Sequence, residues 1–446
     1  MGQGEREQWG SQLGFLMATA GSAIGLGSLW RFPYALGQNG GGAFLLLYVL
    51  FSFLVALPLF IGELIMGRKS RRGPVDAFRS LLPGQDWSFA GWIHVGTAFL
   101  TLSFYCVVAG WGVHYLFMAL THAFDGRSHQ EISSLFHVLY RSSDLNIFWQ
   151  SIFCLMTCSV VYAGVLEGVE RWSRVFTPGL FVFLLILVVY GFHLEGFWPA
   201  VNYLFVPNWG QVTSGSVMEA LGMSFFTLSV GIGIIITYGS YLGKRESAVR
   251  VSGLVAFMTI LVSTMAALAI FPATFTFGVP PSSGPGLVFC TLTPLFSQMW
   301  GGGILSVIFF SLLVFTALTS SISLLEEIVA TLIERYSWSR SYSVALAGLG
   351  SFILGIPSAC AGSGGIFPEW QQVYGVDFFE TVSMLVSDWL FPLGALCIAI
   401  FVGWMAPSHL WGDQFEDARL FAVWRWLVRW VCPIAIGVVF LQGTGS

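Results

Sequence analysis

Four hydroxyl side chains share one helical face in the stretch VFTALTSSISLLEEI. Thr316, Thr319, Ser320 and Ser323 follow one another at the spacing i, i+3, i+4 and i+7, which places them on one side of an α-helix. Uncharged hydroxyl and carbonyl oxygens are ligands that suit a hard cation. One interpretation is therefore an oxygen site for a monovalent cation. The other is that each hydroxyl bonds a carbonyl of its own helix, as Ser and Thr commonly do in apolar helices.

Two apolar stretches contain glycine pairs that weaken a helix. GSAIGLGSLWRFPYALGQNGGGAF (21–44) contains Gly25 and Gly27, and FFTLSVGIG (225–233) contains Gly231 and Gly233. A helix unwound in hydrocarbon leaves peptide N–H and C=O groups unpaired, so it persists only where protein or a ligand satisfies them. Half-helix N-termini then offer N–H groups to an anion, and bare carbonyls can hold a cation. An amino-acid zwitterion beside sodium meets both demands. The alternative is that the glycines only allow close helix packing.

The elements that must position these groups are membrane-spanning helices. The chain has 446 residues, of which 56% are hydrophobic and 9% are charged, which is too little polar surface to cover a soluble globule. Roughly 20 helical residues cross a bilayer core about 30 Å thick. Apolar windows of that length predict eleven spans, near 12–36, 42–67, 88–121, 147–165, 174–193, 215–241, 248–273, 303–334, 342–359, 378–404 and 420–441.

The charges and glycine pairs predict how these spans are arranged. With the N-terminus in the cytoplasm, Arg and Lys residues gather at cytoplasmic span ends, and only Arg31, Arg127 and Arg141 lie elsewhere. Eleven spans then place the C-terminus outside. The glycine pairs fall five spans apart, which predicts an inverted repeat with broken helices. We expect one transmembrane domain over residues 1–446, with repeats at about 12–193 and 215–404 and an extra span at about 420–441.

Several ionisable residues fall at membrane depth, where charge is costly enough to indicate a functional or structural polar role. For Glu63 the simple role is to accept N–H groups from a neighbouring helix break. The spacing gives no role for Glu326, Glu327 or Asp388. The full set is Arg31, Glu63, Glu219, Glu326, Glu327, Glu380 and Asp388. The seven histidines lack ligand spacing and the cysteines form no C-x-x-C pair, so neither a metal centre nor an enzyme is indicated.

These stretches together resemble the neurotransmitter:sodium symporter family, and within it the bacterial amino-acid transporters. The resemblance rests on GSAIGLGSLWRFPY, NGGGAF, SFYCVVAGW (103–111), FFTLSVGIG, IFP (270–272) and LTSSISLLE (318–326), in the family's order from residue 6 to about 404. It implies an all-α polytopic membrane protein, not an enzyme. It also implies sodium-coupled symport of a neutral, hydrophobic amino acid into the cell by alternating access, in the inner membrane of a bacterium.

The resemblance further implies two sodium sites. The second site maps onto Gly21, Ile24, Thr316, Thr319 and Ser320. The first maps onto Ala23, Ser28, Thr227 and Thr259, where Ser28 and Thr259 replace asparagines that are typical of the family. Because these hydroxyls reach less far than an asparagine amide, the number of sodium ions bound, one or two, is left open.

Substrate contacts follow from the same resemblance. The carboxylate would meet the N–H groups of Leu26 and Gly27 and the Tyr105 hydroxyl. The ammonium would meet carbonyls of Ala23, Phe226 and Thr227 and the Ser229 hydroxyl. Ile232 is smaller than the phenylalanine found there in a bacterial leucine transporter, which implies room for a larger cargo. The cargo's side chain would face Ser22, Thr101, Phe226, Ile232, Ser320 and Leu324.

The resemblance also implies two gates, an outer one of Arg31, Glu380 and Phe226 and an inner one of Arg6, Trp9, Glu334 and Tyr241. The family's chloride positions correspond to Tyr48, Met223, Thr227, Thr259 and Ser263, and leave open chloride binding, a proton in its place, or neither. Three alternatives of other kinds stand beside this interpretation: a proton-coupled or other-solute carrier of the same fold, a non-transporting membrane sensor, and a pore.

Overall fold

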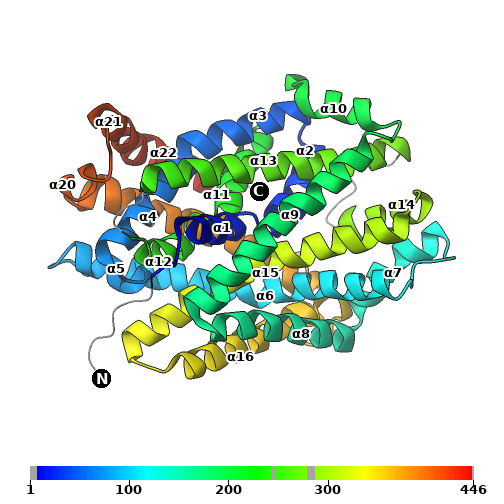
Figure 1. Cartoon of the computed structure of the whole chain (residues 1–446), viewed down its shortest axis with the longest axis horizontal. Coiled ribbons are helices and arrows are strands. Elements are labelled where there is room, and N and C mark those ends of the chain that lie inside the picture. Colours follow the sequence, from blue (N-terminus) through cyan, green and yellow to red (C-terminus); the bar gives the residue numbers. More distant parts are fainter. Residues whose placement is uncertain (1–7, 244–246, 279–286, 444–446) are drawn as a thin grey trace.

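The protein is described by a computed structural model that covers residues 8–243, 247–278 and 287–443. Within these ranges the chain is helical and contains no β-strand, only an isolated bridge between Gly41 and Pro207. Long helices such as α6, α8, α15 and α16 run side by side along the long axis of the molecule (Figure 1). The predicted all-α class is confirmed.

The α-helices follow one another along the chain, in several places joined by a π-helical turn. Their bounds are α1 Gln12–Ala23, α2 Phe32–Gln38, α3 Gly42–Phe51, α4 Leu57–Ser70, α5 Pro74–Leu81, α6 Ser88–Leu120, α7 His129–Arg141, α8 Ser143–Tyr162, α9 Arg171–Gly191, α10 Phe197–Phe205, α11 Ser214–Leu228, α12 Ile234–Ser240, α13 Ala248–Thr276, α14 Thr293–Gln298, α15 Gly302–Tyr336, α16 Arg340–Ala359, α17 Trp370–Tyr374, α18 Phe378–Met384, α19 Phe391–Ile400, α20 His409–Gly412, α21 Ala418–Trp426 and α22 Cys432–Gly443.

Nine continuous helical stretches in the described chain are long and apolar enough to cross a membrane. A tenth is a bent pair, Gln12–Ala23 and Gly27–Gln38, whose axes differ by 58°. The predicted span 215–241 is divided between α11 and α12, each too short to cross alone. That they form an eleventh span, and that the two halves form an inverted repeat, stay predictions.

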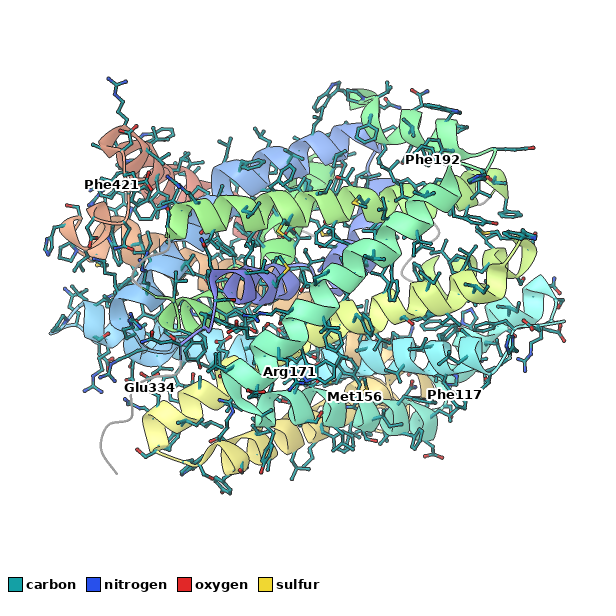
Figure 2. The ribbon with its side chains drawn as sticks, viewed as in Figure 1. Phe117, Met156, Arg171, Phe192, Glu334 and Phe421 are labelled. Carbon is teal, nitrogen blue, oxygen red and sulfur yellow. The ribbon has the colours of Figure 1, made fainter. Side chains whose placement is uncertain are left out.

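The outer surface of the bundle is apolar and the interior is helix against helix. Phe117 and Phe192 point away from the bundle (Figure 2) and are 52% and 58% exposed, as expected of side chains that face lipid. Inside, α1, α11 and α12 lie among the longer helices, with α12 packed on α4 and α1 packed on α9 and α15. The two interrupted helices are therefore held at the centre, where a break is shielded from lipid.

Different short helices lie at the two ends of the bundle. α5, α12, α20 and the N-terminal end of the described chain lie at one end, and α7, α10 and α14 lie at the other (Figure 1). We call these the α5 end and the α7 end. Arg68, Lys69, Arg72 and Arg335, which the charge pattern predicts to be cytoplasmic, belong to the helix ends and the loop that meet at the α5 end.

Candidate functional site

The first helix breaks after Ala23. Ile24 leaves helical geometry at φ −82° and ψ 75°, and regular structure resumes at Gly27. The freed N–H of Leu26 donates to the Tyr105 hydroxyl of α6 at 3.2 Å. A side chain from another helix thus satisfies a peptide group that the break exposes, which is the condition for unwinding in a membrane.

The second break separates α11 from α12. Ser229 adopts the left-handed conformation at φ 53°, and Gly231 and Gly233 follow with φ of 86° and 97°, values that favour glycine. The N–H of Gly231 donates to Oε1 of Glu63 at 2.7 Å, and Glu63 is fully buried. Both predicted breaks are confirmed, and so is the simple role expected of Glu63.

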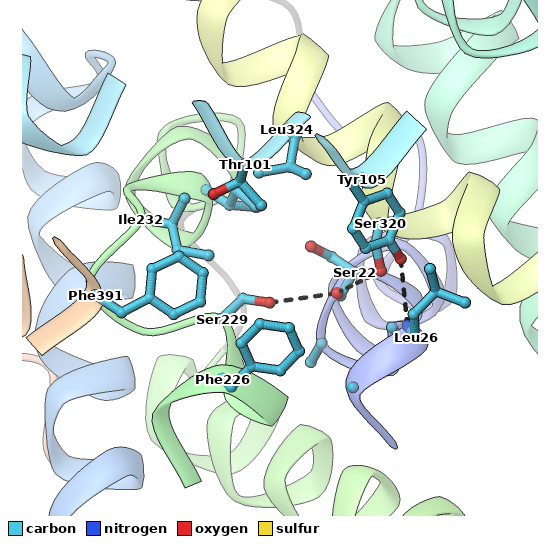
Figure 3. Close-up of a pocket in the computed structure, with 14 residues that line it drawn as sticks. Ser22, Leu26, Thr101, Tyr105, Phe226, Ser229, Ile232, Ser320, Leu324 and Phe391 are labelled. Atoms are coloured by element: carbon cyan, nitrogen blue, oxygen red, sulfur yellow. Dashed lines mark hydrogen bonds between the residues drawn. The ribbon is translucent and has the colours of Figure 1, made fainter. Parts of the chain in front are cut away.

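A small cavity of about 30 Å³ lies between the two breaks (Figure 3). Every predicted substrate contact except Thr227 lines it; the Thr227 hydroxyl is instead 2.9 Å from the Tyr48 hydroxyl. Three lining residues were not predicted. The complete lining is Ser22, Ala23, Gly25, Leu26, Gly27, Thr101, Tyr105, Phe226, Ser229, Ile232, Ile234, Ser320, Leu324 and Phe391.

The cavity is neutral and its few polar groups bond to one another. Ser320 donates to the Ser22 carbonyl at 3.1 Å, and Ser229 donates to the same oxygen at 3.4 Å (Figure 3). No lining residue carries a charge, so a charged cargo side chain would have no partner here. A cavity of this size holds about two water molecules, so a cargo must first push its walls apart.

Phe391, at the start of α19, is the lining residue that matters most among those the sequence analysis missed. Its ring stacks on that of Phe226 at a centroid distance of 5.5 Å, and it stands beside Ile232 in the pocket (Figure 3). The space that the small Ile232 was expected to open is therefore narrowed by Phe391. Nothing in the local sequence of α19 signals this role, because only packing brings α19 to the break.

The four hydroxyls of α15 do not all follow one interpretation, since some bond to carbonyls of their own helix and one does not. Thr316, Thr319 and Ser323 donate to carbonyls of their own helix at 2.8–2.9 Å, as the simple interpretation expects. Ser320 instead reaches across to α1. Gly21 lies against Thr319, because a Cβ on Gly21 would be 3.2 Å from the Thr319 Cβ. Gly21 and Ser320 thus bring α1 and α15 together at the predicted second sodium site, and a donating hydroxyl keeps lone pairs that a cation could use.

The residues of the predicted first sodium site are buried but less well defined as ligands. Thr259 donates to the Val255 carbonyl and Thr227 donates to the Met223 carbonyl, both at 2.9 Å. The Ser28 hydroxyl is fully buried and has no hydrogen-bond partner among the described residues.

A larger cavity of about 380 Å³ adjoins the pocket and shares Leu26, Tyr105 and Phe226 with it. Arg31 and Glu380 both line this larger cavity. Arg31 donates to the Ser387 hydroxyl at 2.8 Å and lies 5.2 Å from the centre of the Phe226 ring. Among the described residues no ion pair joins Arg31 to Glu380, so the predicted outer gate pair faces one cavity without closing it.

The α5 end is closed by the first described residues of the chain. Trp9 donates from its indole to the Tyr238 carbonyl at 3.1 Å and from its backbone to the Tyr241 carbonyl at 3.3 Å. Glu334 accepts from the Gly73 N–H at 2.7 Å and lies 3.6 Å from Arg72. Arg6, the other predicted member of this gate, lies outside the described residues. The pocket thus has a cavity on one side and closely packed residues on the other. We call the contacts that Trp9 and Glu334 make at the α5 end the lock.

Comparison with known proteins agrees with this geometry. The chain matches the family model described as Sodium:neurotransmitter symporter family over residues 6–134 and 130–444. The chain belongs to this family. Relatives include an uncharacterized sodium-dependent transporter, YhdH, of Bacillus subtilis, 38% identical over 98% of both chains, and one of Haemophilus influenzae, 32% identical over 98% of both.

A solved structure in the sodium:neurotransmitter symporter family gives the same picture. The crystal structure of MhsT in complex with L-phenylalanine is 38% identical, with a TM-score of 0.92 over 98% of this chain and 99% of that one. The fold is therefore that of this family. The chain is a multi-pass membrane transporter that couples the transport of a substrate to sodium. The family consists of transporters rather than enzymes, as the sequence predicts.

Proposed function

We propose that this protein carries a neutral, hydrophobic amino acid into a bacterial cell together with sodium, by alternating access. The observation that carries the proposal is the uncharged pocket between two helix breaks, where peptide groups meet apolar side chains. Unwound backbone can bind a carboxylate and an ammonium group, and the apolar wall selects a cargo without a charged side chain. That a relative of TM-score 0.92 was crystallised with L-phenylalanine supports the same cargo class.

In this proposal the break of α1 serves cargo and cation at once. Tyr105 and the Leu26 N–H, now 3.2 Å apart, would both turn to the cargo's carboxylate. Sodium would bind between the carbonyls that end α1 and the hydroxyls of Thr319 and Ser320 on α15. A cation held there ties α1 to α15 and favours the arrangement in which the α5 end is closed, by its difference in affinity for the two states.

We place the α5 end in the cytoplasm, so the larger cavity, lined by Arg31 and Glu380, faces the outside and admits the cargo. The Ser28 hydroxyl is buried and has no partner in the described part of the chain, which favours a second cation near the first break. For chloride, the Tyr48 hydroxyl lies 2.9 Å from that of Thr227 and 3.4 Å from that of Ser263. These hydroxyls already bond to one another, which favours a carrier that works without chloride.

Reconstituted proteoliposomes test the proposal. We expect an inward sodium gradient to drive uptake of labelled L-phenylalanine, and potassium in place of sodium to abolish it. Unlabelled neutral hydrophobic amino acids should compete, whereas lysine and glutamate should not. Uptake that continues in potassium would contradict the sodium coupling, and a protein that binds L-phenylalanine without accumulating it would be a sensor.

A further inference from the structure

A second buried site lies beside the loop Gly231-Ile232-Gly233, the last three residues of the break between α11 and α12. Glu63 of α4, His94 of α6 and Glu327 of α15 are all 0% exposed. One oxygen of Glu63 accepts from Gly231. Its other oxygen, Nε2 of His94 and both oxygens of Glu327 have no hydrogen-bond partner among the described residues.

The loop touches this site at both of its glycines. A Cβ on Gly233 would lie 2.5 Å from Oε1 of Glu327 and 2.9 Å from the Cβ of His94, so both side chains meet at the second glycine as Glu63 meets the first. Ile232, between the glycines, lines the substrate pocket. Three residues of backbone therefore separate the substrate pocket from the buried acids.

The unpaired atoms of this site are all acceptors. Nδ1 of His94 lies 2.6 Å from the Ala90 carbonyl, which can only accept, so Nδ1 carries the hydrogen and Nε2 of a neutral ring has a free lone pair. An ionised carboxylate also only accepts. Buried acceptors without donors are costly, and two neighbouring carboxylates add repulsion. Bound protons would supply the missing donors.

No neighbouring charge offers an alternative to protons. On α15, Glu326 accepts from the Tyr241 hydroxyl at 2.9 Å and pairs with Arg340. On α5, Asp76 pairs with Arg335 at 3.2 Å, and α12 carries no charged residue. No ion pair to Glu63 or Glu327 occurs in the part of the chain that the structure describes, and no group of three potential metal ligands was found there.

We propose that Glu63, His94 and Glu327 form a proton-binding site whose occupancy is coupled to the Gly231-Ile232-Gly233 loop and, through Ile232, to the substrate pocket. The coupling to cargo rests on the proposed function, but the proton site does not. In the observed arrangement Glu327 holds a proton. When the lock at the α5 end opens and the loop moves, water solvates the carboxylate and the proton leaves.

The direction of the pH effect follows from this arrangement. Forming the observed loop geometry takes up a proton, so any binding that favours this geometry is fully present at low pH. It weakens as pH rises through the range in which the free site loses its proton. With one proton linked to binding, the apparent Kd for L-phenylalanine rises by up to about tenfold per pH unit.

Infrared difference spectra of the full chain, taken between pH values, test the proton site without any cargo. We expect the carbonyl stretch of a protonated carboxyl group in the wild type, and its loss or reduction in Glu327→Gln. Glu195→Gln, a change of the same kind at an exposed glutamate, should keep the band. A band that is unchanged in both Glu327→Gln and Glu63→Gln would overturn the assignment.

Calorimetry tests the coupling. L-Phenylalanine is titrated in sodium between about pH 6 and pH 9 in two buffers that differ in ionisation enthalpy, and the difference gives the protons taken up. We expect uptake by the wild type, and a flat pH profile with retained binding for Glu327→Gln. His94→Asn, as a second variant, should shift the pH profile of binding. Sodium-dependent binding of L-phenylalanine without proton uptake would contradict this inference and leave the proposed function standing. An infrared band that titrates in a protein that binds no amino acid would contradict only the proposed cargo.

Discussion

At the level of single residues, the polar groups of the pocket bond to one another until a cargo arrives. The Ser22 carbonyl accepts hydrogen bonds from the hydroxyls of Ser320 and Ser229, and the Tyr105 hydroxyl accepts one from the Leu26 N–H. A zwitterion that enters must exchange these contacts for its own, so affinity reflects the difference between the two sets rather than the number of new hydrogen bonds. In the proposed cation site, sodium would use a lone pair of the Ser320 hydroxyl, which takes part in one of these contacts.

A paired substitution tests the proposed cation site on α15. The double variant Thr319→Val, Ser320→Ala removes the two hydroxyl ligands and keeps the helix, so we expect the sodium needed for half-maximal binding of L-phenylalanine to rise tenfold or more, about 1.4 kcal/mol. Titration of amino-acid binding against sodium measures this.

The matched control for that variant is Thr316→Val. Thr316 is assigned to the cation only through its carbonyl, and its hydroxyl donates to the Leu312 carbonyl, so this change should leave the sodium response close to the wild type. An unaltered sodium response in the double variant would show that the cation binds elsewhere.

At the level of elements, α12 is held from several sides. Trp9 bonds the carbonyls of Tyr238 and Tyr241, and its ring lies 5.1 Å from that of Tyr238. Gly239 of α12 and Gly67 of α4 pack backbone to backbone, since a Cβ on Gly239 would be 2.5 Å from the Leu64 carbonyl oxygen. Movement of α12 therefore requires these contacts with Trp9 and α4 to break.

Removal of the Trp9 side chain tests that lock. A buried Trp→Ala change costs about 3–5 kcal/mol of packing, and here much of it falls on the closed state of the α5 end. We expect Trp9→Ala to speed hydrogen–deuterium exchange in peptides from α1 and α12 and to weaken sodium binding, as mass spectrometry and sodium titration would report.

Trp300→Ala serves as the control for the lock, because Trp300 is 90% exposed. Exchange in α1 and α12 should be unchanged by it. If Trp9→Ala left the exchange of α12 at the wild-type rate, the closure of the α5 end would not depend on this contact.

At the level of the whole molecule, the proposed symport would move net charge. A zwitterion is neutral, so each cycle carries at least the charge of one sodium ion. An inside-negative potential of about 100 mV then contributes about 2.3 kcal/mol per charge, or roughly fifty-fold accumulation. We expect a potassium gradient with valinomycin to raise L-phenylalanine uptake when the interior is negative and to lower it when positive.

Currents on a supported membrane provide an independent measurement of the same quantity. Addition of L-phenylalanine in sodium should produce an inward positive current that is absent in potassium. Uptake indifferent to the potential would contradict a net positive charge per cycle, as would occur if one proton left for each sodium ion that entered.

The sequence by itself determined the membrane class, the two breaks and the residues around them. These follow from local properties: apolar length, a glycine pair in each interrupted stretch, with φ above zero at Gly231 and Gly233, and hydroxyls at helical spacing on α15. The resemblance of a few stretches then placed eleven of the fourteen pocket residues, because the stretches that line a break are the same stretches that carry its motif.

Only the tertiary structure decided which distant side chains meet at those breaks. Phe391 enters the pocket from α19, Arg31 bonds Ser387 rather than Glu380, and Glu327 meets His94 at Gly233. Each pair is far apart along the chain, and the distance between its members depends on how whole helices cross and pack. Helical periodicity fixes which face a residue occupies, but the neighbour on that face is set by the packing of every other helix in the bundle.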